Sequence, residues 1–490
     1  MNSHEFDVSV VVQEGVRYPK LSPFNPPVLF PEFREMNFDV DPDNAVYPIV
    51  RQCLSNLGLD AENIDKQQWN PFGDLVRLGD TVVIKPNLVL HFNKDSDDIE
   101  AVVTHGSVVR PILDYVIKAL KGSGRIVVGD APHGNADFDK IVQANGIKSL
   151  VEYYRRRGIT IDLIDFRKYI YAYGPQGFLR SVPHEVRKDP QGYVVVELNK
   201  DSFLCDLEHL DRLYGSDYDR TFIVKNHLQT HKYCISGSVI NADVVISMPK
   251  AKTHKKTGVT LNLKNLVGIN GDKNYLPHYR IGPPLKGGDE YPDHGSAFLD
   301  IIFWWNRWSR DHLLSRNSLL LRRMFGVLNK PFAYLRSLYV RTTGNRLIEL
   351  GDWPGNDTTW RMCLDLYYIL LYADKTGAIK DGVQRRIFSV VDGIIAGEGD
   401  GPLQPDAKNC GFIVGGKVPL DVDYVTTNLM GFDPGRIKVL DGARRSPLFA
   451  FSSREMEVVC QKGDRIVNYT DLNFAFRPHY AWKGQIEKRK

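Results

Sequence analysis

Five lysines and one histidine occur within residues 249–268, and the chain has no aspartate or glutamate between Asp243 and Asp272. Surface lysines are normally interspersed with acids, so this unbalanced cluster predicts a binding site for an anion. Crowded ammonium groups lower one another's pKa, and a lysine with a lowered pKa can act as a base or as a nucleophilic amine. The candidate catalytic residues are therefore Lys252, His254 and Lys264. The alternative interpretation is a solvated basic loop.

The cationic stretch directly follows residues 242–248, an apolar run that predicts a buried β-strand. Open α/β sheets bind ligands at the carboxyl ends of their strands, which is where this stretch would lie. The tripeptide Lys85-Pro86-Asn87 follows a second apolar run, 80–84, and its proline would hold the flanking side chains at the rim of the sheet. The candidate anion-binding residues are Lys85, Asn87, Lys250, Asn262 and Asn265.

Carboxylates gather in two other loops. Asp130 and His133 stand three residues apart after a predicted strand, 125–128, and could bind a divalent metal, form a base with its orienting partner, or cap a turn beside an exposed imidazole. Asp130 is also placed to bind the ribose of a nucleotide. Residues 392–402 interleave three acids with four glycines, which suits a hard cation but lacks EF-hand spacing. These acids could instead neutralise the lysines. The candidate metal ligands are Asp130, His133, Asp392, Glu398 and Asp400.

The elements that must position these clusters alternate between strand and helix. A predicted strand at 80–84 is followed by a helical pattern at 107–121 and by the strand at 125–128. This order predicts an α/β fold with a doubly wound, mostly parallel sheet in two lobes with a helical insertion. Two shorter runs, 221–224 and 418–423, also read as strands. The expected portions are an N-terminal wrapping segment at 1–45, an α/β lobe at 46–295, a helical insertion at 296–375 and a C-terminal α/β portion at 376–490.

The insertion is basic and aromatic. Within residues 296–345, three tryptophans (Trp304, Trp305 and Trp308) are interleaved with eight arginines and lysines. One interpretation is a helical lid that packs its tryptophans over the core. The other is an interfacial helix that makes a peripheral contact with an anionic membrane surface.

Composition excludes several classes of protein. A net charge of +4 is small for 490 residues, so we expect no nucleic-acid partner. None of the six cysteines is in a CxxC spacing, and we therefore expect no zinc ribbon and no iron–sulfur cluster. The N-terminus lacks the apolar region of a signal peptide and no run of residues is long enough to span a membrane, so a cytoplasmic location is expected. The oligomeric state is not predicted.

In its motifs the chain resembles domain of unknown function family 362 over about residues 80–435. The resemblance implies little about activity, because that family is largely uncharacterised. Some of its members carry a ferredoxin-like iron–sulfur module, for which this chain lacks the cysteines. The helical insertion and residues 355–360 mark a longer branch. The motifs are Lys85-Pro86-Asn87, Thr104-His105, residues 129–132, 249–254 and 263–268, and the acidic loop at 392–402.

A looser similarity of layout connects the chain with lactate-racemase-like proteins, which bind a nickel-pincer nucleotide. That similarity implies a nucleotide-type cofactor, with Lys264 and His133 as the nearest counterparts of its binding residues.

These observations together predict a metal-assisted enzyme that binds an anionic small molecule bearing a phosphate or carboxylate. The expected reaction is either an isomerisation or epimerisation beside a carbonyl, or a group transfer to a phosphorylated or carboxylated metabolite. The alternative is a protein without catalytic activity that binds an anion or a membrane surface.

Overall fold

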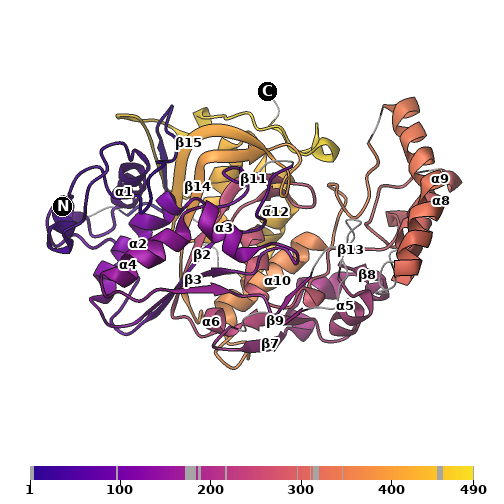
Figure 1. Cartoon of the computed structure of the whole chain (residues 1–490), viewed down its shortest axis with the longest axis horizontal. Helices are drawn as coiled ribbons and strands as arrows, with labels where there is room; N and C mark the ends of the chain where they lie inside the picture. The colour runs from indigo at the N-terminus through magenta and orange to yellow at the C-terminus, as the bar shows by residue number, and fades with distance from the viewer. Residues whose placement is uncertain are drawn as a thin grey trace.

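The computed structural model describes residues 5–94, 98–171, 184–185, 189–215, 218–294, 296–309, 311–312, 319–344, 346–449 and 456–488. This part of the chain is organised around a sheet of 11 strands, most of whose neighbours are parallel (Figure 1). The spatial order is β17–β16–β1–β15–β14–β10–β2–β3–β4, and β11 pairs with β14 and β12. The strands are β1 (Val8–Val12), β2 (Thr81–Pro86), β3 (Arg125–Asp130), β4 (Asp162–Asp165), β10 (Val244–Met248), β11 (Lys250–His254), β12 (Gly258–Thr260), β14 (Arg386–Glu398), β15 (Asp406–Gly416), β16 (Val458–Lys462) and β17 (Arg465–Ile466).

The strand order reverses in the middle of the sheet. β2, β3 and β4 follow one another outward in one direction, whereas β10 and β14 lie on the other side of β2. All four pairs from β14 to β4 are parallel. Such a reversal opens a crevice at the carboxyl ends of the strands on either side of it. Here those ends are Pro86 of β2 and Met248 of β10.

Helices cover both faces of the sheet. Successive side chains of each pleated strand point to opposite faces, so a strand with both faces covered contributes to two cores. Val83 of β2 belongs to a core shared with one set of helices, whereas its neighbours Val82 and Ile84 belong to a core shared with another set. Burial of both faces requires the continuous apolar runs from which the strands were predicted. The doubly wound, mostly parallel α/β fold is confirmed. The helices are α10 (Thr359–Tyr372), α11 (Pro419–Leu429) and α12 (Lys438–Arg445) in the first core, and α1 (Val46–Asn56), α2 (Gly106–Leu120) and α4 (Ile147–Arg156) in the second.

The two predicted α/β portions share this one sheet. β2, β3, β4 and β10 come from the first portion, and β14 and β15 come from the second. The N-terminal segment, expected only to wrap over a domain, contributes β1 between β15 and β16. The domain boundaries themselves stay predictions.

Two short runs that read as strands are helical. The run at 221–224 lies in α5 (Arg220–His227), which Asp219 caps by accepting a hydrogen bond from the Phe222 N–H. The run at 418–423 begins α11, with Pro419 in the first turn, where its fixed φ suits a helix and its missing N–H costs nothing. Short apolar runs do not distinguish a strand from one turn of a buried helix.

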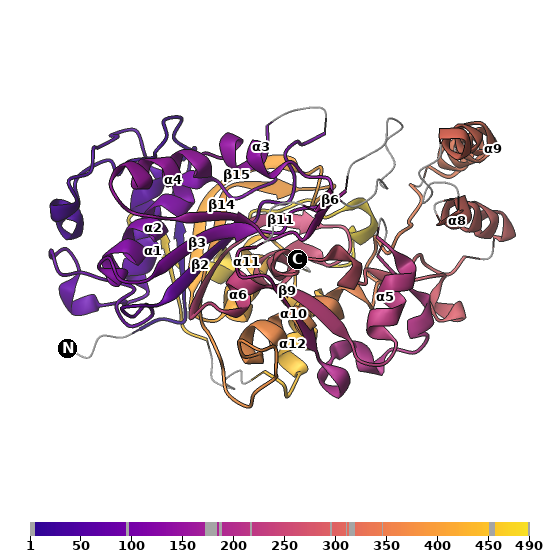
Figure 2. The ribbon, with the colours of Figure 1, turned by 60° about the horizontal axis from the view of Figure 1, so that its bottom comes forward.

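The predicted helical insertion is confirmed as two helices, α8 (Ala297–Ser309) and α9 (Leu319–Thr343). They lie side by side at the end of the molecule far from α1 (Figures 1 and 2). No helix among the described residues is long and apolar enough to cross a membrane. The remaining elements are α3 (Phe138–Ala144), α6 (Gly237–Ile240) and α7 (Asn262–Asn265), and the small two-stranded sheets β5 (Tyr169–Ile170) with β6 (His184–Glu185), β7 (Tyr193–Glu197) with β9 (Lys232–Ser236), and β8 (Leu213–Tyr214) with β13 (Tyr279–Arg280).

Candidate anion-binding pocket

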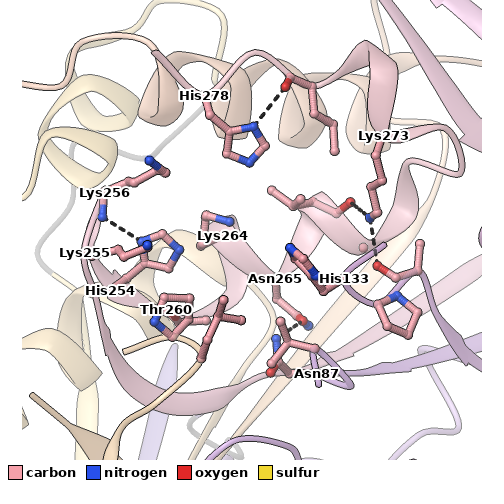
Figure 3. A pocket seen from close by; sticks show the side chains of 18 of the residues that line it. Asn87, His133, His254, Lys255, Lys256, Thr260, Lys264, Asn265, Lys273 and His278 are labelled. Atoms are coloured by element: carbon pink, nitrogen blue, oxygen red, sulfur yellow. Dashed lines mark hydrogen bonds between the residues drawn. The ribbon is translucent and has the colours of Figure 1, made fainter. Parts of the chain in front are cut away.

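A cavity of about 190 Å³ lies at the reversal of strand order (Figure 3). Asn87, just after β2, and Asp130, the last residue of β3, form part of its wall. Among the described residues of the wall Asp130 is the one carboxylate, and its Oδ1 lies 2.7 Å from Nζ of Lys85. The pocket therefore has a large excess of groups that carry or can carry positive charge. They are Lys252, Lys255, Lys256, Lys264, Lys273, His133, His254 and His278.

The cationic stretch reaches the pocket as a short hairpin of strands. β11 pairs in parallel with β14 and antiparallel with β12, so that Lys252 lies opposite Thr260. Its register on β14 shifts between Lys250 and Lys252. A shift of this kind re-aims the side chains on one side of it. This explains why Lys252 and His254 line the pocket while Lys250 does not.

Lys264 of α7 extends into the centre of the pocket, where Figure 3 draws it among His254, His278 and Asn265. No described residue forms a hydrogen bond or ion pair with its ammonium group. Burial lowers its pKa, and the nearby charge of Lys85 lowers it further. The hydroxyl of Thr260 is also buried without a hydrogen-bond partner in the described structure. A buried donor without a partner is costly, and Thr260 is such a donor. The Lys264 side chain is only partly buried, and together the two groups indicate a ligand that accepts hydrogen bonds.

Two further lysines are held by neutral oxygens rather than by carboxylates. Nζ of Lys252 donates to Oδ1 of Asn87 (3.0 Å) and to the Val102 carbonyl (2.5 Å), and burial lowers its pKa well below the ordinary value. Nζ of Lys273 donates to the Ala131 carbonyl (2.8 Å), and burial lowers its pKa to about 7. Carbonyl and amide oxygens orient an ammonium group without neutralising it. An incoming anion would therefore meet their remaining charge.

The two histidines of the inner wall have opposite hydrogen-bonding roles. Nδ1 of His254 accepts from the backbone N–H groups of Lys256 (3.0 Å) and Thr257 (3.3 Å), so its proton is on Nε2. Nδ1 of His278 faces the Leu276 carbonyl at 2.9 Å and must donate to it, which leaves Nε2 with a lone pair. Burial, followed by the charges of nearby lysines, lowers the pKa of both rings well below 6.5. One ring thus offers the pocket a donor and the other an acceptor.

Lys255 and Lys256 share one carboxylate at the rim. Asp352 lies 2.9 Å from Nζ of Lys255 through Oδ2 and 2.7 Å from Nζ of Lys256 through Oδ1. Burial alone would raise the pKa of Asp352, but the two ammonium groups lower it. Asp352 therefore ties both lysines to the rim of the pocket.

Three of the predicted anion-binding residues lie behind the wall of the pocket. Lys250 is buried with Asp392, whose Oδ2 lies 2.7 Å from its Nζ. Asn262 donates to Asp423 at 2.8 Å. Lys85 is held by Asp130 and by Oδ1 of Asn265 (2.9 Å). None of these three lines the cavity, and their part in anion binding stays a prediction. The other two, Asn87 and Asn265, line the cavity.

The five predicted metal ligands are not gathered at one place. Asp130 and His133 line the pocket, but Asp392 accepts from Lys250 and from the Tyr18 hydroxyl (2.6 Å). Two of the acids face cations elsewhere: Glu398 binds Arg477 and Lys408, and Asp400 binds Arg346. No group of three or more His, Cys, Asp and Glu suited to a metal occurs among the residues described. The structure therefore does not bring these five residues together, and metal binding stays a prediction.

The comparisons with known proteins agree with the motifs. The model of the family described as "Domain of unknown function (DUF362)" matches residues 82–182 and 202–428, which is more than half of the chain. The chain belongs to this family. No curated protein matches it. A crystal structure of a Thermotoga maritima protein aligns at 9% identity and a TM-score of 0.31, over 81% of this chain and 59% of that chain.

In this DUF362 member three of the family motifs line the pocket. The residues of 249–254 and 263–268 form two of its walls, and residues 129–133 form a third. Sequence reasoning missed two functional candidates, Lys273 and His278. Lys273 lies directly after Asp272, the residue taken as the end of the cationic stretch, whereas His278 is isolated in the sequence. The similarity to lactate-racemase-like proteins stays a prediction, although its two named residues, Lys264 and His133, both line the pocket.

The last glycine of the DUF362 lysine motif, Gly268, is needed for close packing. A Cβ at this position would lie 1.8 Å from Oδ1 of Asp130 and 2.7 Å from Nζ of Lys85. We expect Gly268→Ala to lower the free energy of unfolding by about 3 kcal/mol, because the buried pair cannot yield without losing its hydrogen bonds. Urea unfolding measures this loss. Gly382→Ala is the control, since a Cβ there meets nothing within 4 Å, and equal effects of both changes would contradict the packing argument.

Proposed function

We propose that this protein is an enzyme that binds a small phosphorylated or carboxylated metabolite in the pocket and moves a proton beside its carbonyl group. One observation carries the proposal: the ammonium group of Lys264 extends without a partner in the described structure into a cavity lined by four other lysines. An anion is the ligand that relieves this accumulation of charge. The hydroxyl of Thr260 and Nε2–H of His254 add two donors for its oxygens.

The arrangement favours an isomerase or epimerase over a transferase. Nε2 of His278 is a lone-pair acceptor within the same pocket, and its pKa is held down by burial and by lysine charges. A bound anion offsets those charges and raises the pKa of His278 toward the range of an effective general base. We therefore assign proton abstraction to His278, and ligand binding to His254, for which proton transfer was expected. Lys264 and Lys252, with their lowered pKa values, are the alternative bases.

The dimensions of the pocket favour a small ligand. Its volume of about 190 Å³ is below the roughly 300–1,000 Å³ usual for ligand sites. A hollow of about 410 Å³ adjoins it and shares His133, Lys255 and Leu403 with it, which leaves room for the rest of a longer metabolite. A divalent metal, a nucleotide-type cofactor and a cytoplasmic location stay predictions.

Sulfate tests the pocket, because its charge does not change from about pH 6 to about pH 9. The pKa of Lys273 in the free protein is about 7, and a bound dianion raises it, so binding is accompanied by proton uptake. Sulfate affinity is therefore expected to be highest below pH 7 and to fall as the pH rises, by up to about tenfold per pH unit for each proton taken up. Isothermal titration calorimetry in buffers of different ionisation enthalpy measures both quantities.

Lys273→Met should weaken the pH dependence, whereas Lys408→Met should leave it unchanged. Lys408 is the control because it pairs with Glu398 and does not line the pocket. A sulfate affinity that does not depend on pH, or the same slope in both variants, would refute the electrostatic basis of the proposal. Turnover is then tested by proton exchange with deuterated water on a panel of phosphorylated and carboxylated carbonyl compounds, with His278→Asn as the inactive reference.

A further inference from the structure

The helices α8 and α9 form a hairpin with an apolar interior of its own. The rings of Trp305 and Phe332 stack with centroids 4.7 Å apart, and Phe325 is buried beside Trp305. At the base, Phe303 stacks on Tyr291 at 3.9 Å. These contacts belong to clusters separate from the two cores of the central sheet. Trp305 and Trp308 therefore pack within the hairpin rather than against either core of the central sheet.

A second apolar face of the hairpin is exposed. On α9, Leu320 (68% exposed), Met324, Val327 (66%), Tyr334 and Leu338 recur at intervals of three, four or seven residues along most of the helix, which places them on one face. On α8, Ile301 and Trp304 are also more than half exposed. Isolated exposed apolar side chains are ordinary on a protein surface. A continuous row over a helix of 25 residues marks a binding surface instead.

The charge of this segment is entirely of one sign. Residues 312–348 contain seven arginines and lysines and no aspartate or glutamate. Arg323, Lys330 and Arg341 are exposed, and their spacing places them along one edge of the apolar row. Arg310, Arg316 and the side chain of Arg322 lie outside the described residues. A row of aliphatic and aromatic side chains bordered by cations is typical of a helix that lies in a membrane interface.

Three partners could cover the exposed apolar face of α9: a second copy of the chain, a nucleic acid or an anionic bilayer. Charge complementarity distinguishes between them. A second copy of the chain would bring two basic surfaces together, and like charges facing each other oppose association. A nucleic acid would meet the cations, but it gains nothing from burying Leu320, Val327 and Leu338. A bilayer containing anionic lipid satisfies both features, because its headgroups attract the cations and its acyl region accepts the apolar row.

We propose that the hairpin docks this protein on anionic membranes, with α9 lying in the plane of the interface. Trp304 and Tyr334 would sit at the level of the headgroups, where amphipathic rings are favoured. This surface is distinct from the anion pocket, and the proposal does not depend on the reaction catalysed there.

Vesicle flotation of the whole protein tests the docking proposal. The protein is mixed with vesicles of phosphatidylcholine alone or with about 30 mol% phosphatidylserine. We expect flotation with the anionic vesicles and little with the neutral ones, and a decrease when the salt concentration is raised. Two triple variants, Trp304→Ser/Leu320→Ser/Val327→Ser and Arg323→Glu/Lys330→Glu/Arg341→Glu, should each lower the partition coefficient at least about tenfold.

The control variants change the same residue types elsewhere on the surface. Leu78→Ser/Ile466→Ser removes two apolar side chains that are each more than half exposed, and Lys140→Glu/Lys225→Glu reverses two exposed charges. Neither should alter flotation. Sulfate affinity should be unchanged in all four variants, which separates a failure of docking from a failure of the pocket and checks that the variants are folded.

Three results would overturn the proposal. The first is the absence of flotation with anionic vesicles. The second is an equal loss of flotation in the controls. The third is a dimer, detected by sedimentation velocity, that the hairpin variants dissociate while vesicles recover none of the wild-type protein.

Discussion

Replacement of Lys264 with methionine is expected to weaken sulfate binding by at least about tenfold and, at the same time, to raise the melting temperature of the ligand-free protein. The first effect follows because a hydrogen-bonded charge pair in a buried site contributes about 1.5–3 kcal/mol. The second follows because the Lys264 ammonium has no partner in the described structure and its pKa is lowered by burial. Below the pKa of the unfolded chain, the charged form therefore opposes folding.

A substitution that weakens ligand binding but stabilises the free protein indicates that the original residue serves the ligand rather than the fold. Calorimetric titration with sulfate and differential scanning calorimetry without it measure the two effects. Lys225→Met, on the exposed surface of α5, is the matched control and should alter neither quantity appreciably. Retention of sulfate affinity within about threefold in Lys264→Met would remove the observation on which the proposed function rests.

Lys250→Met should differ from Lys264→Met in both measurements. We expect a large loss of stability and no direct effect on sulfate binding. The Lys250 ammonium lies 2.7 Å from Oδ2 of Asp392, and both side chains are inaccessible to solvent. Removal of one partner leaves a buried, uncompensated carboxylate, which costs about 3–5 kcal/mol. Hydrogen bonds from the Tyr18 hydroxyl and from the His105 N–H keep Asp392 oriented but cannot neutralise it.

Urea unfolding measures the loss, and Lys250→Met/Asp392→Leu should recover a substantial part of it, because the double variant buries no charge. Lys408→Met is the control at a partly exposed pair and should cost about 1 kcal/mol or less, because Glu398 keeps its second partner, Arg477. A small effect of Lys250→Met on stability together with lost sulfate binding would return Lys250 to the ligand site, where the sequence pattern had placed it.

The strand-end clusters could be predicted because parallel strands bury both faces and leave polar side chains at their carboxyl ends. Three residues singled out in this way, Lys252, Lys264 and Asn265, line the pocket. It did not separate Lys250 from Lys252, because both have the same parity in a regular strand and the register shift that divides them depends on the pairing with β14.

The partners of the acidic residues in the loop at 392–402 could not be predicted, for a different reason. A carboxylate in a glycine-rich loop can bind a metal or pair with a distant cation of the same chain, and the spacing is compatible with both. Asp392 pairs with a lysine 142 positions away, and Glu398 pairs with Arg477, 79 positions away. His278 was missed because a single histidine has no sequence signal until the fold brings it to a pocket.

The few residues that follow α9 connect the hairpin with the pocket, the two places where we propose that charge is recognised. The Leu350 carbonyl accepts a hydrogen bond from Lys256, Leu350 lines the pocket, and Asp352 binds Lys255 and Lys256. The same short segment leads directly to the last turn of α9. Ligand binding in the pocket and docking of the hairpin on a membrane would therefore both affect the segment that contains Leu350 and Asp352. By thermodynamic reciprocity, any factor by which a bilayer changes the affinity for the metabolite is the factor by which the metabolite changes the affinity for the bilayer.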